Sequence, residues 1–205
     1  MKLLVVAATI EEIEQSIDFL NNKKIDFLVT GVGMLATAHK LTKYLTNKKI
    51  DLIINVGVGG ILNTTDNLGE VYQVAEDYIY DFGAEDNDSF IPIESLGFGN
   101  SLFKEKIPNT FLNNQTVKKV TGITSNKVHG NKKTIIELQK RHTGTIIESM
   151  EGAAVFYIAE QEQTNCLQFR SSSNYIEPRN RNTWKIKEAI TNLNLFLQAE
   201  IDRII

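Results

Sequence analysis

Two glutamates and one asparagine follow predicted strands of this chain, and side chains of these types can transfer protons or hold a ligand. Glu12 comes soon after the first apolar run, and Glu151 comes after the run that ends at Ile147. Asn174 follows the last apolar run. Ligands of open α/β sheets bind beyond the carboxyl ends of the strands. The two carboxylates are therefore candidates for general base or electrostatic catalysis, and the amide is a candidate ligand contact.

Each of these residues also has a purely structural interpretation. Thr9 and Glu12 together have the form of a capping box at the start of a helix. Glu151 lies near the start of a predicted helix, where the helix dipole favours an acidic side chain. The small residues after Glu151 indicate a helix start pressed closely against something, which favours a functional role for Glu151 as much as a structural one. Asn174 is by type a turn residue. From the residues alone, both interpretations stay open.

Two glycine-rich stretches follow the second and third apolar runs. Gly31 and Gly33 precede a helix, where backbone N–H groups can approach a ligand oxygen, although a tight turn explains them equally well. Ala36 replaces the third glycine of a dinucleotide-binding fingerprint. Three glycines within residues 57–60 indicate a close approach to a strand or a ligand. No Lys-Ser/Thr pair follows them, which excludes a P-loop.

Strands and helices alternate along the chain, and these elements must position the candidate residues. Mostly continuous apolar runs, as in strands covered on both faces, are found at Leu3–Ala7, Ile25–Thr30, Leu52–Val56, Val71–Ile79, Val117–Thr124, Thr145–Ile147 and Cys166–Ser172. Helical patterns are found at Ile10–Leu20, Leu35–Leu45, Lys132–Arg141, Met150–Gln161 and Trp184–Ile204. The alternation predicts a mostly parallel sheet with helices on both sides. Residues 83–115 lack a clear pattern and are predicted to be a surface excursion that carries function or an interface.

Composition narrows the class of protein. The 205 residues, 42% of them apolar, predict one domain over residues 1–205. A net charge of −3 argues against nucleic-acid binding. Cys166 is the only cysteine, so no internal disulfide is possible, and the three scattered histidines indicate no metal site. The first apolar stretch, of about eight residues, is too short for a signal peptide or a membrane span, so a cytoplasmic protein is expected.

Taken in order, these stretches resemble the nucleoside phosphorylase/nucleosidase superfamily. The matches are "MKLLVVAATIEE", "NVGVGG", "ESMEGAA" and "RSSSN", and they extend over essentially the whole chain. The resemblance implies a three-layer α/β/α fold with a central mixed, mostly parallel sheet, and a homo-oligomer that binds a purine nucleoside without a cofactor. Within the superfamily, "SNYIEPRNRNTWKI" is most similar to the futalosine hydrolases, which release hypoxanthine from futalosine in menaquinone biosynthesis.

The resemblance also implies roles for individual residues. Glu12 matches the carboxylate that activates the attacking water, and Glu151 matches the one that holds the ribose hydroxyls. Asn174 matches the residue that faces the purine ring. The other substrate-binding positions that it implies are Gly57, Val128, His129, Met150 and Ser173. Arg179 and Arg181 are candidates only because they follow Asn174 in the sequence. Gly57 is a departure, because the adenosine-type nucleosidases have a serine there whose hydroxyl contacts the water.

Asn174 is a second departure, because the methylthioadenosine/S-adenosylhomocysteine nucleosidases typically have an aspartate there. A protonated Asp can donate to purine N7 and accept from a 6-amino group. An Asn amide donates instead to a 6-oxo group and accepts from protonated N7. Asn174 therefore predicts hypoxanthine or guanine as the base, because adenine would leave the amide unpaired.

Several alternatives stay open. Water is the expected nucleophile, because the glycine-rich turns carry no Arg or Lys for a phosphate, although Arg170 precedes the last strand end. The alternatives are a 6-oxopurine nucleoside phosphorylase, a methylthioadenosine-type nucleosidase, a non-catalytic nucleoside-binding module, and a scaffold whose polar strand ends only cap helices. Arg179 or Arg181 is a candidate for binding the carboxylate at the far end of futalosine, or is solvated. The 83–115 excursion is the expected oligomer interface.

Overall fold

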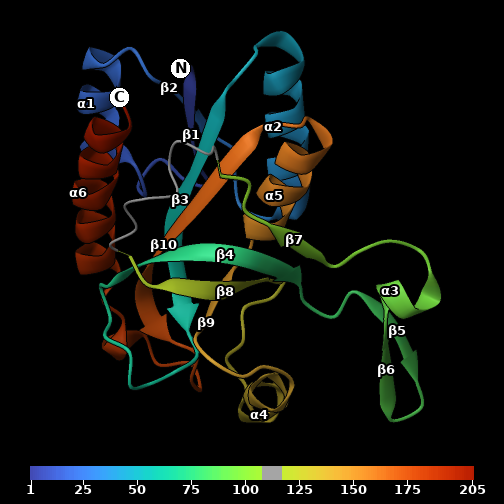
Figure 1. The fold of residues 1–205 in the computed structure, drawn as a ribbon. Helices are drawn as coiled ribbons and strands as arrows, with labels where there is room; N and C mark the ends of the chain where they lie inside the picture. Colours follow the sequence, from blue (N-terminus) through green and yellow to red (C-terminus); the bar gives the residue numbers. More distant parts are fainter. Residues whose placement is uncertain (108–116) are drawn as a thin grey trace.

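A central sheet lies between layers of helices in the computed structural model, which describes residues 1–107 and 117–205 (Figure 1). The strands of this sheet are β1 (Leu3–Ala7), β2 (Asp26–Val29), β3 (Leu52–Ile61), β4 (Val71–Ile79), β7 (Leu102–Lys104), β8 (Lys119–Thr124), β9 (Ile146–Ser149) and β10 (Asn165–Tyr175). The helices are α1 (Ile17–Asn22), α2 (Met34–Asn47), α3 (Ile93–Leu96), α4 (Lys132–Arg141), α5 (Gly152–Gln161) and α6 (Ile186–Ile204).

Strands β3 and β10 are the long central strands of the sheet. The strand order is β10-β4-β8-β9-β3-β1-β2, and β10 also pairs with β3, so five of these strands close into a ring. Most of the pairings are parallel, whereas β10–β4, β3–β9 and β4–β7 are antiparallel. The fold is therefore the predicted three-layer arrangement with a mixed, mostly parallel sheet.

Both long strands extend further than their apolar runs. β3 was expected to end at Val56 but continues through the glycines to Ile61, and β10 continues past Ser172 to Tyr175. Asn174 therefore lies within a strand, not after one. Continuous pairing between β3 and β10, with a register shift between Ser172 and Asn174, holds both extensions. The helix expected from Ile10 begins only at α1, after a turn and the 3₁₀ helix η1 (Glu14–Ser16).

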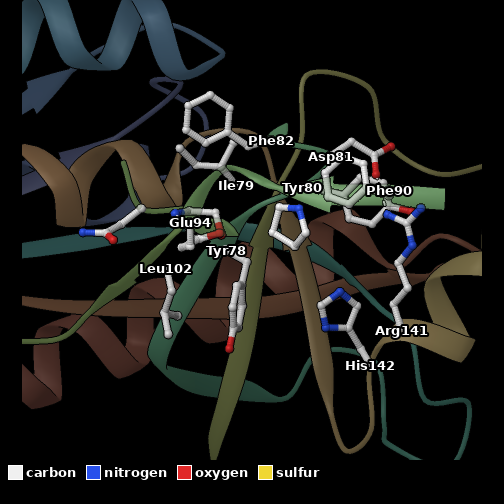
Figure 2. A pocket seen from close by; sticks show the side chains of 13 residues that line it. Tyr78, Ile79, Tyr80, Asp81, Phe82, Phe90, Glu94, Leu102, Arg141 and His142 are labelled. Carbon is white, nitrogen blue, oxygen red and sulfur yellow. Dashed lines mark hydrogen bonds and ion pairs between the residues drawn. The ribbon is translucent and has the colours of Figure 1, made fainter. Parts of the chain in front are cut away.

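The excursion contains more structure than its sequence pattern indicated. Strands β5 (Gly83–Asp86) and β6 (Ser89–Pro92) form a hairpin that, with α3, projects from the body of the molecule (Figure 1). β7 returns the chain to the sheet beside β4. Residues 108–116, which include the end of the excursion, lie outside the described residues. A hollow of about 550 Å³ separates this arm from the body, and aromatic side chains including Tyr78, Tyr80 and Phe90 line it (Figure 2).

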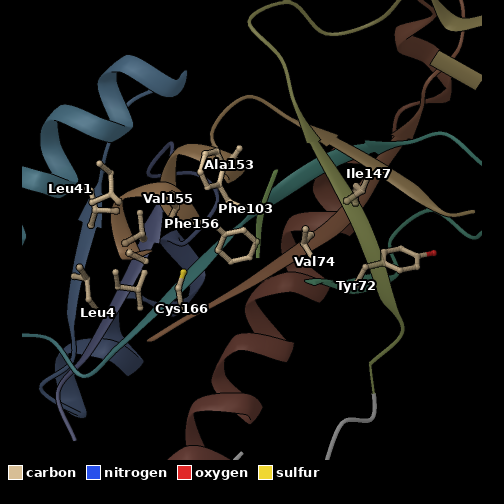
Figure 3. Close-up of a cluster of buried hydrophobic side chains, with 14 of the residues drawn as sticks. Leu4, Leu41, Tyr72, Val74, Phe103, Ile147, Ala153, Val155, Phe156 and Cys166 are labelled. Atoms are coloured by element: carbon tan, nitrogen blue, oxygen red, sulfur yellow. The ribbon is translucent and has the colours of Figure 1, made fainter. Parts of the chain in front are cut away.

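The core has two layers because both faces of the sheet are covered. In β1, Leu4 and Val6 pack toward α2 and α5 in a cluster that also contains Phe156 and Cys166 (Figure 3). Leu3 and the alternate residues of β1 pack on the opposite face, with residues of α6. This alternation follows from the two-residue period of a strand. None of the described helices has the length and apolar character that crossing a membrane requires.

Candidate active site

A cavity of about 250 Å³ opens beyond the carboxyl ends of the strands and collects most of the predicted site residues. Those that line it are Glu12, Val128, His129, Met150, Glu151, Ser173, Asn174 and Arg179. Gly57 and Arg181 are not among the lining residues. Four glutamates line the cavity, whereas Arg179 is the one Lys or Arg among its described lining residues. The cavity therefore attracts cationic or neutral groups more than anions.

Glu12 is a buried carboxylate held by backbone N–H groups. Its Oε2 accepts from the N–H groups of Ala8 and Thr9 at 3.1 and 3.0 Å, and its Oε1 accepts from Val58 N at 3.0 Å. The capping-box contact with Thr9 is thus present, but the carboxylate joins the end of β1 to β3 and caps no α-helix. Asn194 of α6 donates to the carbonyl oxygen of Glu12 at 2.9 Å and holds its backbone in place.

Burial raises the pKa of the Glu12 carboxyl, while the positive charge of Arg170 and the N–H groups of Val58 and Thr9 lower it. A carboxylate with a raised pKa is a stronger base than an exposed glutamate, which suits proton abstraction from water. Gly57 lies between the two charged groups. A Cβ at Gly57 would lie 2.7 Å from Glu12 Oε1 and 3.3 Å from Arg170 Nη1, so a side chain there would displace one of them.

Arg170 is a buried cation that the sequence interpretation left without a role. It is 2% exposed, and Nη1 donates to the carbonyl of Phe169 at 3.2 Å. Its Nε has no hydrogen-bond partner within the part of the chain that the structure describes. The guanidinium is absent from the cavity lining, but it borders the same space beside Gly57 as the Glu12 carboxylate. Its charge therefore acts on Glu12 through the protein interior, where screening by water is weak.

Arg170→Gln is expected to move the acidic limb of the kcat/KM profile to higher pH by about one unit or more. Glu12 must be ionised to accept a proton, and the Arg170 charge lowers its pKa. Without that charge the pKa rises, so activity is lost first at low pH. Arg170→Lys, which keeps the charge, is the matched variant. An unchanged limb in Arg170→Gln, or an equal shift in both variants, would contradict this role.

Glu151 lines the same cavity from the start of α5. Its Oε1 accepts from Gly33 N at 2.8 Å, and its Oε2 accepts from Met150 N at 3.3 Å. Gly33 adopts a φ of 94°, in the left-handed region that favours glycine. The glycine turn after β2 therefore presents an N–H group to a carboxylate of this chain and holds Glu151 in position.

The start of α5 is packed as tightly as its small residues indicated. A Cβ at Gly152 would overlap the carboxylate of Asp77 and the amide of Gln168. Asp77 is fully buried and accepts from Gln168 Nε2 and Thr124 Oγ1, each at 2.8 Å. Burial raises the pKa of Asp77 to about 6 against these hydrogen bonds. This polar network fixes the backbone from which the Glu151 side chain extends.

Gly152→Ala is expected to destabilise the protein by about 1–3 kcal/mol, because the added methyl group must displace buried polar atoms. Thermal unfolding should show a fall of several degrees in Tm, and kcat should fall as Glu151 moves. Gly130→Ala is the matched control, since its Cβ would meet Arg179 only at an ordinary 3.5 Å. Equal Tm values for the two variants would contradict the packing argument.

Asn174 presents a partly paired amide to the cavity. Its Oδ1 accepts from Ser173 Oγ at 2.9 Å, and its Nδ2 donates to the carbonyl of Tyr175 at 3.0 Å. An amide has two acceptor positions and two N–H donors, so one of each remains for a ligand. A Cβ at Gly60 would lie 3.1 Å from Nδ2, so the absence of a side chain there leaves room for the amide.

The rest of the wall contains residues that the sequence interpretation missed or used differently. Glu148, which directly follows the apolar run ending at Ile147, lines the cavity and contacts His129. Trp184, the first residue of the last helical pattern, is half-buried and lines the cavity. The guanidinium of Arg179 lies 5.1 Å from its ring centroid and that of Arg181 lies 5.9 Å from it.

Comparisons with known proteins identify the family of this chain and relatives that share its fold. The sequence model of the family described as "Phosphorylase superfamily" matches residues 12–205. The futalosine hydrolase of Streptomyces coelicolor is 30% identical over 179 residues, covering 82% of this chain and 74% of that relative. The structure of a futalosine hydrolase of Helicobacter pylori shares the fold with a TM-score of 0.83 at 15% identity, covering 99% and 98% of the two chains. A methylthioadenosine/S-adenosylhomocysteine nucleosidase of Neisseria meningitidis, bound to methylthio-immucillin-A, matches with a TM-score of 0.80 at 16% identity, covering 98% of each chain.

Proposed function

This chain belongs to the phosphorylase superfamily, and on that premise we propose that it hydrolyses the N-glycosidic bond of futalosine. The products are hypoxanthine and dehypoxanthinylfutalosine, an activity of menaquinone biosynthesis. The proposal is supported by relatives that bear the name futalosine hydrolase, at 24–30% identity. The observation that carries it is the cavity in which Glu12, Glu151 and Asn174 line one space.

Cleavage of an N-glycosidic bond develops positive charge on the ribose, as in an oxocarbenium ion. Glu151 lines the cavity as a carboxylate with both oxygens positioned by N–H groups, so it can hold the ribose hydroxyls and stabilise that charge. Glu12, with its raised pKa, takes the proton from water as the oxygen attacks the anomeric carbon. The C–N bond breaks as the C–O bond forms, and its electron pair leaves with the purine.

Asn174 accounts for the departure of a 6-oxopurine rather than a 6-aminopurine. Its free N–H can donate to O6, and its free lone pair can accept from N7–H of the leaving hypoxanthine. An amide supplies no proton, so the N7 proton comes from water. Ser173 fixes the orientation of the amide by donating to Oδ1. Adenine would place its amino group against the same N–H and leave both donors unpaired.

The charge of the cavity favours water over phosphate as the nucleophile. A phosphate bound beside the ribose needs several cationic groups or N–H donors. The described lining residues contain four glutamates and one Arg, and Glu12 and Glu151 already accept the nearby backbone N–H groups. These features argue against the phosphorylase alternative.

Identifying the released base tests the proposed function. Purified protein is incubated with futalosine, inosine and methylthioadenosine, each with and without phosphate, and the free base is identified by chromatography. We expect hypoxanthine from futalosine at equal rates with and without phosphate. Adenine release from methylthioadenosine as the main activity, strict phosphate dependence, or no release at all would overturn the proposal.

Arg179 is proposed to bind the carboxylate at the far end of the futalosine 5′ extension. Arg179 lines the cavity, whereas Arg181 lies on Trp184 outside the lining, which favours Arg179 as the candidate. Arg179→Ala is expected to raise KM for futalosine about tenfold and leave inosine hydrolysis unchanged. Arg181→Ala is the matched control and should change neither. An equal effect of Arg179→Ala on both substrates would contradict the assignment.

A homo-oligomer formed through the 83–115 excursion is also proposed. The β5–β6 hairpin stands away from the body, and a two-stranded hairpin is marginal without further packing (Figure 1). Phe98 on this excursion is 80% exposed, and Phe82 just before it is 40% exposed, which is typical of a contact surface. A second copy seated there would also fill the hollow beside Tyr80 (Figure 2). Light scattering compares the molar mass of the intact protein with that of a Phe98→Lys variant. The proposal predicts an oligomer for the intact protein and a smaller mass for the variant, and equal masses would contradict this interface.

A further inference from the structure

Glu148 is a buried carboxylate in the cavity wall for which bond cleavage needs no role. Its side chain is 3% exposed, and it lines the cavity from the end of β9. A buried charge is unfavourable unless it is paired or hydrogen-bonded. The proposed hydrolysis uses Glu12 and Glu151 as its two carboxylates, so the presence of Glu148 in the same space calls for a separate explanation.

The contacts of Glu148 leave one acceptor position free. Oε1 accepts from Ser125 Oγ at 2.9 Å and lies 2.5 Å from Nδ1 of His129. Oε2 accepts from the backbone N–H of His129 at 2.9 Å. A carboxylate offers about four acceptor positions, and three are taken. The protein therefore holds this group in a fixed orientation and leaves Oε2 able to accept one more N–H.

The register of the sheet sets Glu148 opposite Asn174. Gly60 of β3 pairs with Glu148 on β9 and with Asn174 on β10. Residues paired across neighbouring strands point to the same face, and two strand spacings separate these side chains by about 9.5 Å. Gly60 lies between them without a side chain. A flat purine can therefore lie over Gly60, with one edge toward Asn174 and another toward Glu148.

Only one class of purine has hydrogen-bonding atoms that suit both Asn174 and Glu148. A 6-oxopurine carries a proton on N1, which donates to a carboxylate. In adenine N1 is an acceptor, and its lone pair would face the Glu148 charge. We propose that Glu148 accepts the N1–H of the 6-oxopurine and is a second specificity-determining residue, on the opposite side of the base from Asn174. This assignment rests on the proposed function, because it presumes that the cavity holds a purine.

Binding of free bases tests the assignment without requiring turnover. Isothermal titration of the intact protein with hypoxanthine, 1-methylhypoxanthine and adenine compares a base that has N1–H with two that lack it. We expect hypoxanthine to bind at least tenfold more tightly than either of the others. In Glu148→Gln we expect the affinity for hypoxanthine to fall about tenfold, while the affinity for 1-methylhypoxanthine stays the same. Weaker binding of both bases by the same factor would overturn the assignment.

The test has a matched control variant and a second measurement that does not depend on the folding of Glu148→Gln. Glu105→Gln changes another poorly exposed glutamate, which accepts from Gln73 and pairs with Lys119 outside the cavity. It should leave the preference for hypoxanthine intact. If Glu148→Gln does not fold, the wild-type comparison of hypoxanthine with 1-methylhypoxanthine decides, and equal affinities would refute the N1–H contact. Failure of the proposed function would differ, since it would appear in the nucleoside assay as adenine release, phosphate dependence or no release of a base.

Discussion

Glu12→Gln is expected to lower kcat for futalosine by about 10²–10⁴-fold, the usual range for loss of a positioned general base. The amide cannot take a proton from water. Both oxygens of Glu12 accept backbone N–H groups, so one side of the new amide must also face a donor. Steady-state kinetics at saturating futalosine measures the loss, and hypoxanthine binding should be unchanged, because Glu12 acts on the water and not on the base.

Glu11→Gln is the natural comparison, because this neighbouring glutamate is exposed and does not line the cavity. It should retain full activity. The raised pKa of Glu12 adds a second readout, since activity in the native protein should fall as pH drops through a value above that of an exposed glutamate. A loss of less than threefold in Glu12→Gln would show that another group activates the water.

Asn174→Asp is expected to reverse the choice of base. Hydrolysis of futalosine should fall about 10²-fold or more, because the half-buried carboxylate has no amide N–H to donate to O6. Release of adenine from methylthioadenosine should rise, since a protonated Asp can donate to N7 and accept from the 6-amino group. The ratio of kcat/KM for the two substrates is the quantity to measure.

Asn192→Asp makes the same chemical change outside the cavity, where Asn192 donates to the carbonyl of Gly69. It should leave the substrate ratio unchanged. If Asn174→Asp keeps its preference for futalosine, the base is selected elsewhere, and Glu148 becomes the first residue to test.

The layered fold was predictable from the sequence wherever the pattern of apolar side chains in a segment indicates a buried strand or an amphipathic helix. Strands β1 and β4 and helix α4 have the predicted bounds. The ends of β3 and β10 were not predictable in the same way. Glycines usually weaken a strand, yet those of β3 allow Glu12, Asn174 and the backbone of β9 to approach closely. That requirement comes from partners distant in the sequence.

The site was predictable in part for the same reason. Glu12, Glu151 and Asn174 were identified by their positions near strand ends, together with the resemblance, and the structure brings all three to one cavity. The pairings that position them join distant residues, as between Glu151 and Gly33, which are 118 residues apart. Arg170 sits inside an apolar run, so only the folded structure shows that its charge reaches Glu12.

The most direct test of hydrolysis is to follow the oxygen that joins the sugar. The protein is incubated with futalosine in ¹⁸O-labelled water containing phosphate, and the products are analysed by mass spectrometry. The predicted result is hypoxanthine together with a phosphate-free sugar product that carries one ¹⁸O atom at its anomeric hydroxyl. A sugar 1-phosphate without the label, or intact futalosine after prolonged incubation, would contradict the account.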